Sequence, residues 1–421
     1  MPVAPSHLVT TVINQHVEES AILRNIRSVL LTAPHVKLHQ LRRLDDRIAA
    51  HLDGLAIAGD FGVALSMEAL ETPGVGEVFA AAVRAIEDAD KGRLDRLFAV
   101  AEAVPEAQPG LISSFGWVSS QVLQGTVSQL LASGSPFRRR VGIAACAMHR
   151  VSPGAALDAA LEHLDSPLRA RALRTLGDLG KRDTLASVRD SLEDENEGCR
   201  FWAARSAVLL GDRESALARL ASVCQAPGPQ RERAMHLTLR AMDVPRAHEL
   251  LKLFARELKD IRPLIQGAGI AGDPHYVPWL IRHMDDLKLA RLAGESFTFI
   301  TGLDLAYLNL DRRRPEGVEF GPNDNPEDDD VSMDPDDSLP WPDRQKITAW
   351  WTAHSQRFQS GVRYFMGEPV SRGHCLTVLK EGCQRQRIAA AEFLCLLDPG
   401  TGLFPTSAPA WRQQRWLAEM S

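Results

Sequence analysis

Three stretches of the sequence repeat one another at a constant offset of 31 residues. They read SPFRRRVGIAACAMHR from Ser135, SPLRARALRTLGDLGK from Ser166 and EGCRFWAARSAVLLGD from Glu197. Each stretch has the start signal and the apolar periodicity of a helix, and a second apolar helical segment follows it. A helix pair of this kind exposes an apolar face that only the next pair can cover, so the pairs must stack. The sequence therefore predicts an all-α fold, a right-handed α-solenoid of helical repeats.

An arginine recurs in register early in the first helix of each unit. The five positions are Arg138, Arg169, Arg200, Arg231 and Arg262. We interpret them as a structural ladder of charge-assisted hydrogen bonds to turn acids and carbonyls of the adjacent repeat. Ligand binding is the alternative, but a feature present in every unit suits architecture better than a unique site. The pattern resembles HEAT-like repeats such as those of phycobilisome lyases.

The chain divides into four parts on these patterns. Residues 1–130 are expected to be an N-terminal helical cap grading into degenerate repeats, because their helical pattern does not keep the arginine register. Residues 131–313 form the HEAT-like repeat array. Residues 314–342 are an acidic, proline-rich loop or linker, since they cannot build a core. Residues 343–421 form a C-terminal helical module, in which EGCQRQRIAAAEFLCLL echoes the third repeat and indicates a displaced repeat.

The negative charge of the chain is concentrated in one segment. The formal net charge is −6, with 54 acidic and 48 basic residues, and DNPEDDDVSMDPDD from Asp324 to Asp337 holds eight of the acids. Without that segment the chain is close to neutral, which argues against general affinity for nucleic acid. The acids expected to contact or steer a basic partner are Glu327, Asp328, Asp329, Asp330, Asp334, Asp336 and Asp337. The alternative is a solvated linker whose charge only keeps it extended.

The sequence GAGIAGD from Gly267 to Asp273 fits the dinucleotide fingerprint GxGxxG followed by an acid. That fingerprint requires a preceding strand and a crossover unit. Here the preceding residues carry the ladder arginine Arg262 and belong to a predicted helix. The glycines fall where sibling repeats have small residues, so we interpret them as sites of close helix packing and predict no cofactor.

Histidines are the main candidates for a metal site, since the carboxylates of residues 324–337 lack the glycine and terminal glutamate of a calcium-binding loop. His35 and His39 have the spacing of two ligands on one helical turn, with His16 and His51 nearby in sequence. No HExxH motif accompanies them, and Pro34 places His35 at a loop or helix start. We therefore interpret them as packing or surface residues. No nucleophile motif or phosphate loop is present either. The sequence predicts no enzyme activity, no catalytic residues and no metal.

The six cysteines form no CxxC pair and lie mostly inside apolar helical patterns, which is typical of reduced cysteines in a core. The first twenty residues lack the features of a signal peptide, and no apolar run is long enough to span a membrane. These observations favour a cytoplasmic protein without a membrane partner.

Four further segments resemble a bacterial family of HEAT-repeat proteins encoded beside type VI secretion effectors. They are HLVTTVINQHVEESAILRNIRS, LDDRIAAHLDGL, AGESFTFITGLDL and WPDRQKITAWW. The resemblance implies a protein without enzymatic activity that binds and neutralises a toxin, in one case a nuclease. It supplies no catalytic residues. Two alternatives stay open: an adaptor that loads effectors onto the secretion apparatus, and a lyase or modifying enzyme of the phycobilisome-lyase type.

Overall fold

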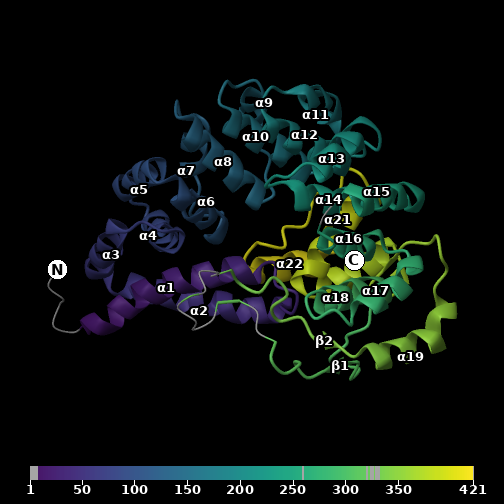
Figure 1. The fold of residues 1–421 in the computed structure, drawn as a ribbon. Coiled ribbons are helices and arrows are strands. Elements are labelled where there is room, and N and C mark those ends of the chain that lie inside the picture. The colour runs from purple at the N-terminus through teal and green to yellow at the C-terminus, as the bar shows by residue number, and fades with distance from the viewer. Residues whose placement is uncertain (1–7, 258–259, 319–320, 323–326, 328–331, 421) are drawn as a thin grey trace.

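The computed structural model describes residues 8–257, 260–318, 321, 322, 327 and 332–420. Within these residues the protein is mostly helical, and the helices stack one upon another in an arc (Figure 1). The predicted helical architecture is confirmed at this level. The right-handed superhelix and the constant period stay predictions.

The α-helices of the described residues are α1 (Thr10–Leu30), α2 (Leu38–Ile57), α3 (Gly59–Glu68), α4 (Val75–Glu87), α5 (Lys91–Ala103), α6 (Gln108–Trp117), α7 (Thr126–Leu131), α8 (Pro136–Met148), α9 (Ala155–Leu161), α10 (Ser166–Asp178), α11 (Leu185–Asp190), α12 (Glu197–Leu209), α13 (Ser215–Gln225), α14 (Arg231–Ala241), α15 (Val244–Glu257), α16 (Arg262–Ala271), α17 (Val277–His283), α18 (Ala290–Thr301), α19 (Arg344–His354), α20 (Arg372–Glu381), α21 (Gln384–Leu397) and α22 (Ala410–Glu419). The strands are β1 (Asp311–Arg312), β2 (Trp341–Pro342), β3 (Tyr364–Phe365) and β4 (Glu368–Pro369).

The array has two layers. The even-numbered helices from α4 to α18 contact one another in order and form the inner layer, and the odd-numbered helices from α3 to α17 cover them as the outer layer. Inner helices begin at side-chain caps: Ser135, Asp165 and Asn196 each accept a hydrogen bond from a backbone N–H of the first turn. The turns that follow use glycines with positive φ, such as Gly180 at 68° and Gly272 at 74°.

The glycines of GAGIAGD lie in α16 and at its C-terminal cap, as the packing interpretation predicted. A Cβ on Gly269 would lie 2.7 Å from the Cα of Ser296 in α18, and one on Gly267 would lie 2.7 Å from a methyl carbon of Leu251. Among the described residues no strand directly precedes the motif, because the residues before Gly267 already belong to α16. Gly269 therefore lets the inner helices α16 and α18 approach each other closely, and Gly267 makes room for Leu251 of the outer helix α15.

We expect Gly269→Ala to lower the free energy of unfolding by about 1–3 kcal/mol, because the new methyl group meets backbone atoms that cannot rotate away. Gly373→Ala in α20 is the matched control, since nothing lies within 4 Å of its Cβ position. There alanine should raise stability by up to about 1 kcal/mol through helix propensity alone. Urea denaturation of both variants measures the difference. Equal effects at the two positions would contradict close α16–α18 packing.

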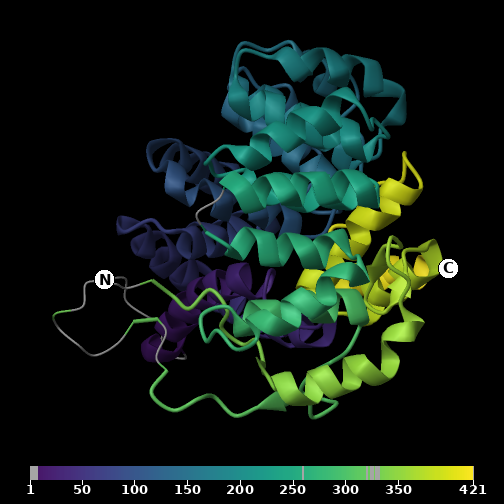
Figure 2. The same ribbon diagram turned by 45° about the vertical axis from the view of Figure 1, so that its right-hand side comes forward.

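The C-terminal part of the chain runs back along the array from its last repeat to its first (Figures 1 and 2). The β3–β4 hairpin binds the carboxyl ends of α16 and α18 through hydrogen bonds from Tyr364 N to Gly272 O (2.8 Å) and Met366 N to Phe299 O (2.7 Å). Helix α21 then contacts α12 and α14, and α22 packs against α2. We call residues 363–420 the return module.

Arginines hold the return module to the array by donating to carbonyl groups at helix ends. Arg363 donates to the carbonyl oxygen of Leu239 at the end of α14 (2.8 Å) and to that of Ala271 at the end of α16 (3.0 Å). Arg412 donates to the carbonyl oxygens of Gly116 and Val118 at the end of α6 (2.8 and 2.7 Å). The last carbonyl groups of a helix have no hydrogen-bond donors within the helix, and they carry its partial negative charge. An arginine at this end therefore supplies the missing donors and also a favourable positive charge.

The return module also closes on the N-terminal helices. Arg27 of α1 and Asp45 of α2 form a buried ion pair (Nε–Oδ1 2.6 Å), and Oδ2 of Asp45 accepts the first N–H of α22, from Ala410, at 2.7 Å. Gln384 N donates to Val36 O at 2.8 Å. The inner face of the array is therefore partly covered by its own chain, and it is not the open concave surface that a simple solenoid would offer to a partner.

The acidic segment leaves and rejoins the array at one point. Strands β1 and β2 pair antiparallel, with Asp311 opposite Pro342 and Arg312 opposite Trp341. The segment between the two strands therefore begins and ends at one place beside the array, so in the sequence it is an insertion between α18 and α19. Among the described residues no single helix has the length and apolar character to cross a bilayer, although α2 and the segment to Glu71 meet that test together, bent by 115°.

Candidate functional site

The acidic loop is anchored to the array by two of the carboxylates expected to meet a partner. Asp336 is 3% exposed and forms a bidentate ion pair with Arg262, with Nη1–Oδ2 at 3.0 Å. Asp334 pairs with Arg291 at 2.7 Å, and Arg291 also donates to the backbone oxygen of Asp336 at 2.9 Å. Asp334 and Asp336 thus neutralise buried or half-buried arginines of the array, and their contact with a partner stays a prediction.

The other acids of the predicted set have different positions. Glu327 and Asp337 are exposed. Asp328, Asp329 and Asp330 lie outside the described residues. The downstream half of the loop is thus fixed by ion pairs, and the exposed acid Asp337 is adjacent to that anchor. Asp337 is therefore presented at a defined place on the array.

Two of the ladder arginines form hydrogen bonds with the same turn, which precedes α12. Arg169 of α10 is 8% exposed and forms a bidentate pair with Asp194, 3.0 Å from each oxygen. Arg200 of α12 donates to the carbonyl oxygens of Asp194 and Glu195 at 2.7 and 2.9 Å. Hydrogen bonds from Arg169 and Asn196 lower the pKa of Asp194 despite its partial burial. These contacts hold the turn before α12 in place.

The remaining ladder arginines have individual partners. Arg138 pairs with Asp95 at 2.6 Å, and its guanidinium lies over a phenylalanine ring. Arg231 donates to the carbonyl oxygen of Cys224 at 3.0 Å. Arg262 binds the acidic loop, as described above. All five arginines thus make contacts within the array, of the kind that a structural role requires.

A second register of basic side chains was missed in the sequence. Two positions beyond each ladder arginine the inner helices α8, α10, α12 and α14 carry Arg140, Arg171, Trp202 and Arg233. The first three line a groove of about 360 Å³ across the inner face, together with Arg174. The constant offset of 31 residues could have revealed this row in the sequence. It was missed because one of the four positions is a tryptophan, so the row is not a continuous series of arginines.

Three arginines lie around the ring of Trp202. The guanidinium carbons of Arg174, Arg205 and Arg233 lie 4.7, 5.4 and 5.5 Å from its ring centroid. Asp178 pairs with Arg174 at 3.2 Å and with Arg205 at 2.9 Å. We call Arg140, Arg171, Arg174, Arg205 and Arg233 together with Trp202 the arginine groove.

The crowded positive charges of the arginine groove destabilise the folded state. Burial and the neighbouring Arg174 lower the pKa of Arg171 to about 9. Burial together with Arg174 and Arg205 also lowers the pKa of Arg233. Charged groups crowded at an energetic cost are typical of binding sites, where stability is exchanged for function.

We expect Arg171→Gln to raise the free energy of unfolding by about 0.5–1.5 kcal/mol at pH 7, after allowance for partial solvent screening. The pKa of this arginine is lowered in the folded state, so the protonated form disfavours folding at every pH below about 9. Arg169→Gln is the matched control and should lower stability by about 1–3 kcal/mol, because it leaves Asp194 without its partner. Chemical denaturation distinguishes the two signs. A loss of stability in both variants would contradict the crowding.

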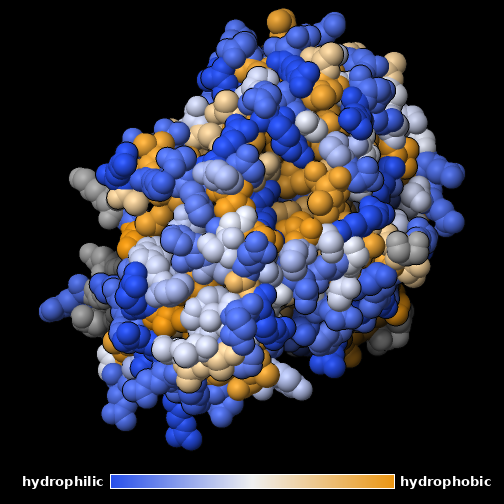
Figure 3. Space-filling view, turned by 90° about the vertical axis from the view of Figure 1, so that its right-hand side faces the viewer, coloured by the Kyte–Doolittle hydropathy of each residue, from blue (hydrophilic) through white to orange (hydrophobic). Residues whose placement is uncertain are grey.

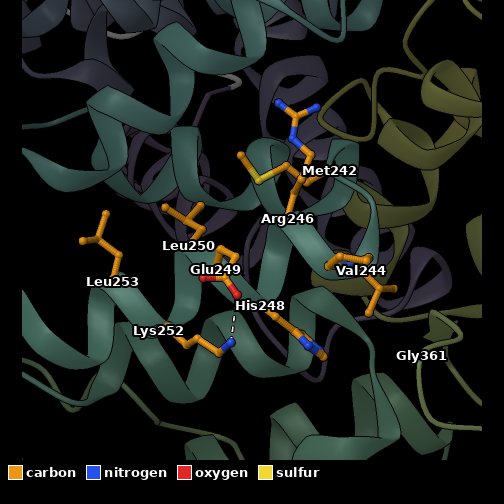
Figure 4. A pocket seen from close by; sticks show the side chains of 10 residues that line it. Met242, Val244, Arg246, His248, Glu249, Leu250, Lys252, Leu253 and Gly361 are labelled. Carbon is orange, nitrogen blue, oxygen red and sulfur yellow. Dashed lines mark hydrogen bonds and ion pairs between the residues drawn. The ribbon is translucent and has the colours of Figure 1, made fainter.

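A second groove lies on the outer surface at α15, on the side of the molecule that Figure 3 turns toward the viewer. It encloses about 720 Å³, and Met242, Val244, Leu250 and Leu253 give it an apolar lining. Figure 3 shows a hollow with hydrophobic side chains on this face. Lysine 252 pairs with Glu249 at 2.8 Å on its rim (Figure 4).

His248, which lines the α15 groove, lies close to a buried aspartate that does not line it. Nε2 of His248 is 3.1 Å from Oδ2 of the fully buried Asp273. Asp273 also accepts backbone N–H groups from His275 (2.8 Å) and Gly361 (3.0 Å), so it orders the turn after α16 and the segment before β3. No serine, threonine or cysteine is among the described residues that line this groove. Asp273 therefore joins these two segments through the hydrogen bonds that it accepts from their backbone.

The histidines considered as metal ligands are dispersed. His16 and His51 face each other with 3.0 Å between their Nδ1 atoms, while His35 and His39 are exposed. Among the described residues no group of three His, Cys, Asp or Glu side chains could hold a metal ion.

Five of the six cysteines are buried, and burial raises the pKa of Cys224 to about 12, which disfavours the reactive thiolate.

The repeats can be classified by comparison with known proteins. Residues 155–240, from α9 to the end of α14, match the family model for HEAT repeats. No curated protein and no solved structure matches the chain. HEAT repeats are generally protein–protein interaction modules, and the arginine groove lies partly within the matched repeats.

Proposed function

We propose that the protein is a non-enzymatic binding protein that recognises one folded protein partner in the cytoplasm. The partner is a toxin of a type VI secretion system, possessing a basic surface such as a nuclease cleft, and binding neutralises it. The HEAT repeats support the general role, and the resemblance of four sequence segments to a family encoded beside such effectors supports the particular one. An adaptor that loads an effector is the second candidate.

The anchoring of the acidic loop is the observation that carries this proposal. A linker that only separates two parts of a chain needs no buried contacts. Here Asp334 and Asp336 fix the loop to Arg291 and Arg262 beside the last repeats. The exposed Asp337 is held beside this anchor, from where it can attract a basic surface over distances of about 8 Å at physiological salt.

The test begins with co-purification of the protein and the product of the adjacent gene. Association rates are then measured for a variant in which Glu327, Asp328, Asp329, Asp330 and Asp337 become Gln or Asn. We expect association to slow by about tenfold at low salt, with a smaller difference at high salt, because charge steering is screened. The anchors Asp334 and Asp336 stay unchanged, so the fold is preserved.

The matched control removes five exposed acids elsewhere, Glu106, Asp158, Glu162, Asp183 and Glu257. It changes the net charge equally but should leave association within about twofold of the wild type. Equal association rates for the two variants and the wild type would indicate that the loop is only a linker. Toxin activity in the complex distinguishes the two candidates: an immunity protein abolishes it, whereas an adaptor binds a secretion component as well.

A further inference from the structure

The arginine groove has the properties of a second binding site, of opposite charge to the acidic loop. Arg140, Arg171, Trp202 and Arg233 occupy corresponding positions on four successive inner helices, α8 to α14. Neighbouring helices pack about 8–10 Å apart, so the row extends over about 25–30 Å. The return module contacts the same helices at their carboxyl-terminal halves, through Glu392 and Leu403, and does not line the groove.

The positive charge of the groove is compensated only in part. Asp178 pairs with Arg174 and Arg205. Among the described residues no carboxylate lies within ion-pair distance of Arg140, Arg171 or Arg233. The Nε groups of Arg140 and Arg171 are buried and make no hydrogen bond to any described residue. Buried donors without acceptors are costly, so a ligand that supplies acceptors would gain from them.

Apart from Gln108, whose side-chain oxygen accepts a hydrogen bond from Arg140, the remaining lining of the groove is apolar. It consists of Pro105, Pro109, Ile112, Ala144, Pro167 and Ala170. These side chains lie between the arginines of successive helices and offer nothing to a phosphate group. They do offer contact to aliphatic side chains. The ligand that fits both properties carries carboxylates and apolar groups in alternation.

We propose that the arginine groove binds an extended segment of a protein partner in which acidic and apolar residues are interspersed. A row of about 25–30 Å accommodates about eight or nine residues of extended chain. Carboxylates would accept hydrogen bonds from Arg140, Arg171 and Arg233, and apolar side chains would contact the prolines and Trp202. This site goes beyond the proposed function, since it would hold even if the acidic loop were a linker.

The test uses the full-length protein and a fluorescein-labelled peptide of about nine residues, in which glutamate alternates with valine. Its matched control replaces glutamate with glutamine. We expect the glutamate peptide to bind at least about tenfold more tightly than the control, and binding to weaken as salt increases. A single-stranded oligodeoxynucleotide of equal charge is measured beside them.

The protein variant R140Q/R171Q/R233Q should lose at least about tenfold in affinity for the glutamate peptide. The control R43Q/R96Q/R282Q removes three exposed arginines outside the groove and should stay within about twofold of the wild type. Circular dichroism verifies that both variants are folded. A second test does not depend on a loss of affinity. The variant R140E/R171E/R233E should gain affinity for a peptide in which lysine alternates with valine.

Three results would overturn the proposal. The first is that the glutamate peptide does not bind better than its glutamine control. The second is that the groove variant and the control variant have the same affinity for it. The third is that the oligodeoxynucleotide displaces the peptide and binds at least about tenfold more tightly, which would assign the groove to nucleic acid.

Discussion

Replacing Asp45 with alanine is expected to lower the free energy of unfolding by about 3–5 kcal/mol. Asp45 is fully buried between the N-terminal helices and α22. The substitution leaves the Arg27 guanidinium, which is 6% exposed, without its counter-charge, and removes the acceptor for the N–H of Ala410. An uncompensated buried charge is among the largest single effects on stability.

Urea denaturation followed by circular dichroism and by tryptophan fluorescence measures this effect, and coincident curves establish that unfolding is two-state. Asp46→Ala is the control on the adjacent residue. Asp46 is exposed and pairs with Arg42 one helical turn away, so its loss should cost at most about 0.5 kcal/mol. If both variants are equally stable, Asp45 does not join the two ends of the chain.

Replacing Glu392 with alanine should have a similar effect at the middle of the array, about 3–5 kcal/mol. Glu392 of α21 forms a charge-assisted hydrogen bond with Arg240 of α14, and both side chains are at most 10% exposed. Residues 152 positions apart are thus joined inside the inner face. Removal of one partner leaves Arg240 charged and buried.

A double substitution separates the ion pair from the packing around it. Arg240→Met with Glu392→Leu replaces both charges by apolar groups of similar volume and should recover most of the lost stability. The same denaturation measurements apply. Additive losses in the double variant would indicate that the two side chains do not interact, and would place α21 outside the array.

The repeat array was predictable because it is built from local, periodic features. The register that begins at Ser135, Ser166 and Glu197 corresponds to the starts of α8, α10 and α12. The helix caps and turn glycines have sequence signatures that act over a few residues. The packing interpretation of Gly267 and Gly269 followed from the same register.

The return module was not predictable as a closure, since its contacts connect residues distant in sequence. Arg412 donates to carbonyl groups of residues nearly 300 positions earlier. Backbone carbonyls are present at every residue, so nothing in the sequence marks these as the partners. The echo of a repeat at 381–397 indicated a helix but could not indicate that it lies against α12 and α14.

The acidic loop shows the limit of composition as a guide to function. Eight acids in one segment indicated a shared role, yet the structure divides them. Asp334 and Asp336 neutralise Arg291 and Arg262, while Asp337 is exposed beside them. Arg262 belongs to the predicted ladder and Asp336 to the predicted partner surface, and they are 74 positions apart, so no local pattern in the sequence connects the two.

Hydrogen exchange of single amides tests most directly the central claim, that the return module closes the array. The amides of Tyr364, Gln384, Leu403 and Ala410 donate to Gly272, Val36, Asp178 and Asp45, at four places from the last repeat to the first. Closure predicts that all four exchange about as slowly as amides within the inner helices. Exchange at the rate of an unstructured chain, with the inner helices still protected, would contradict it.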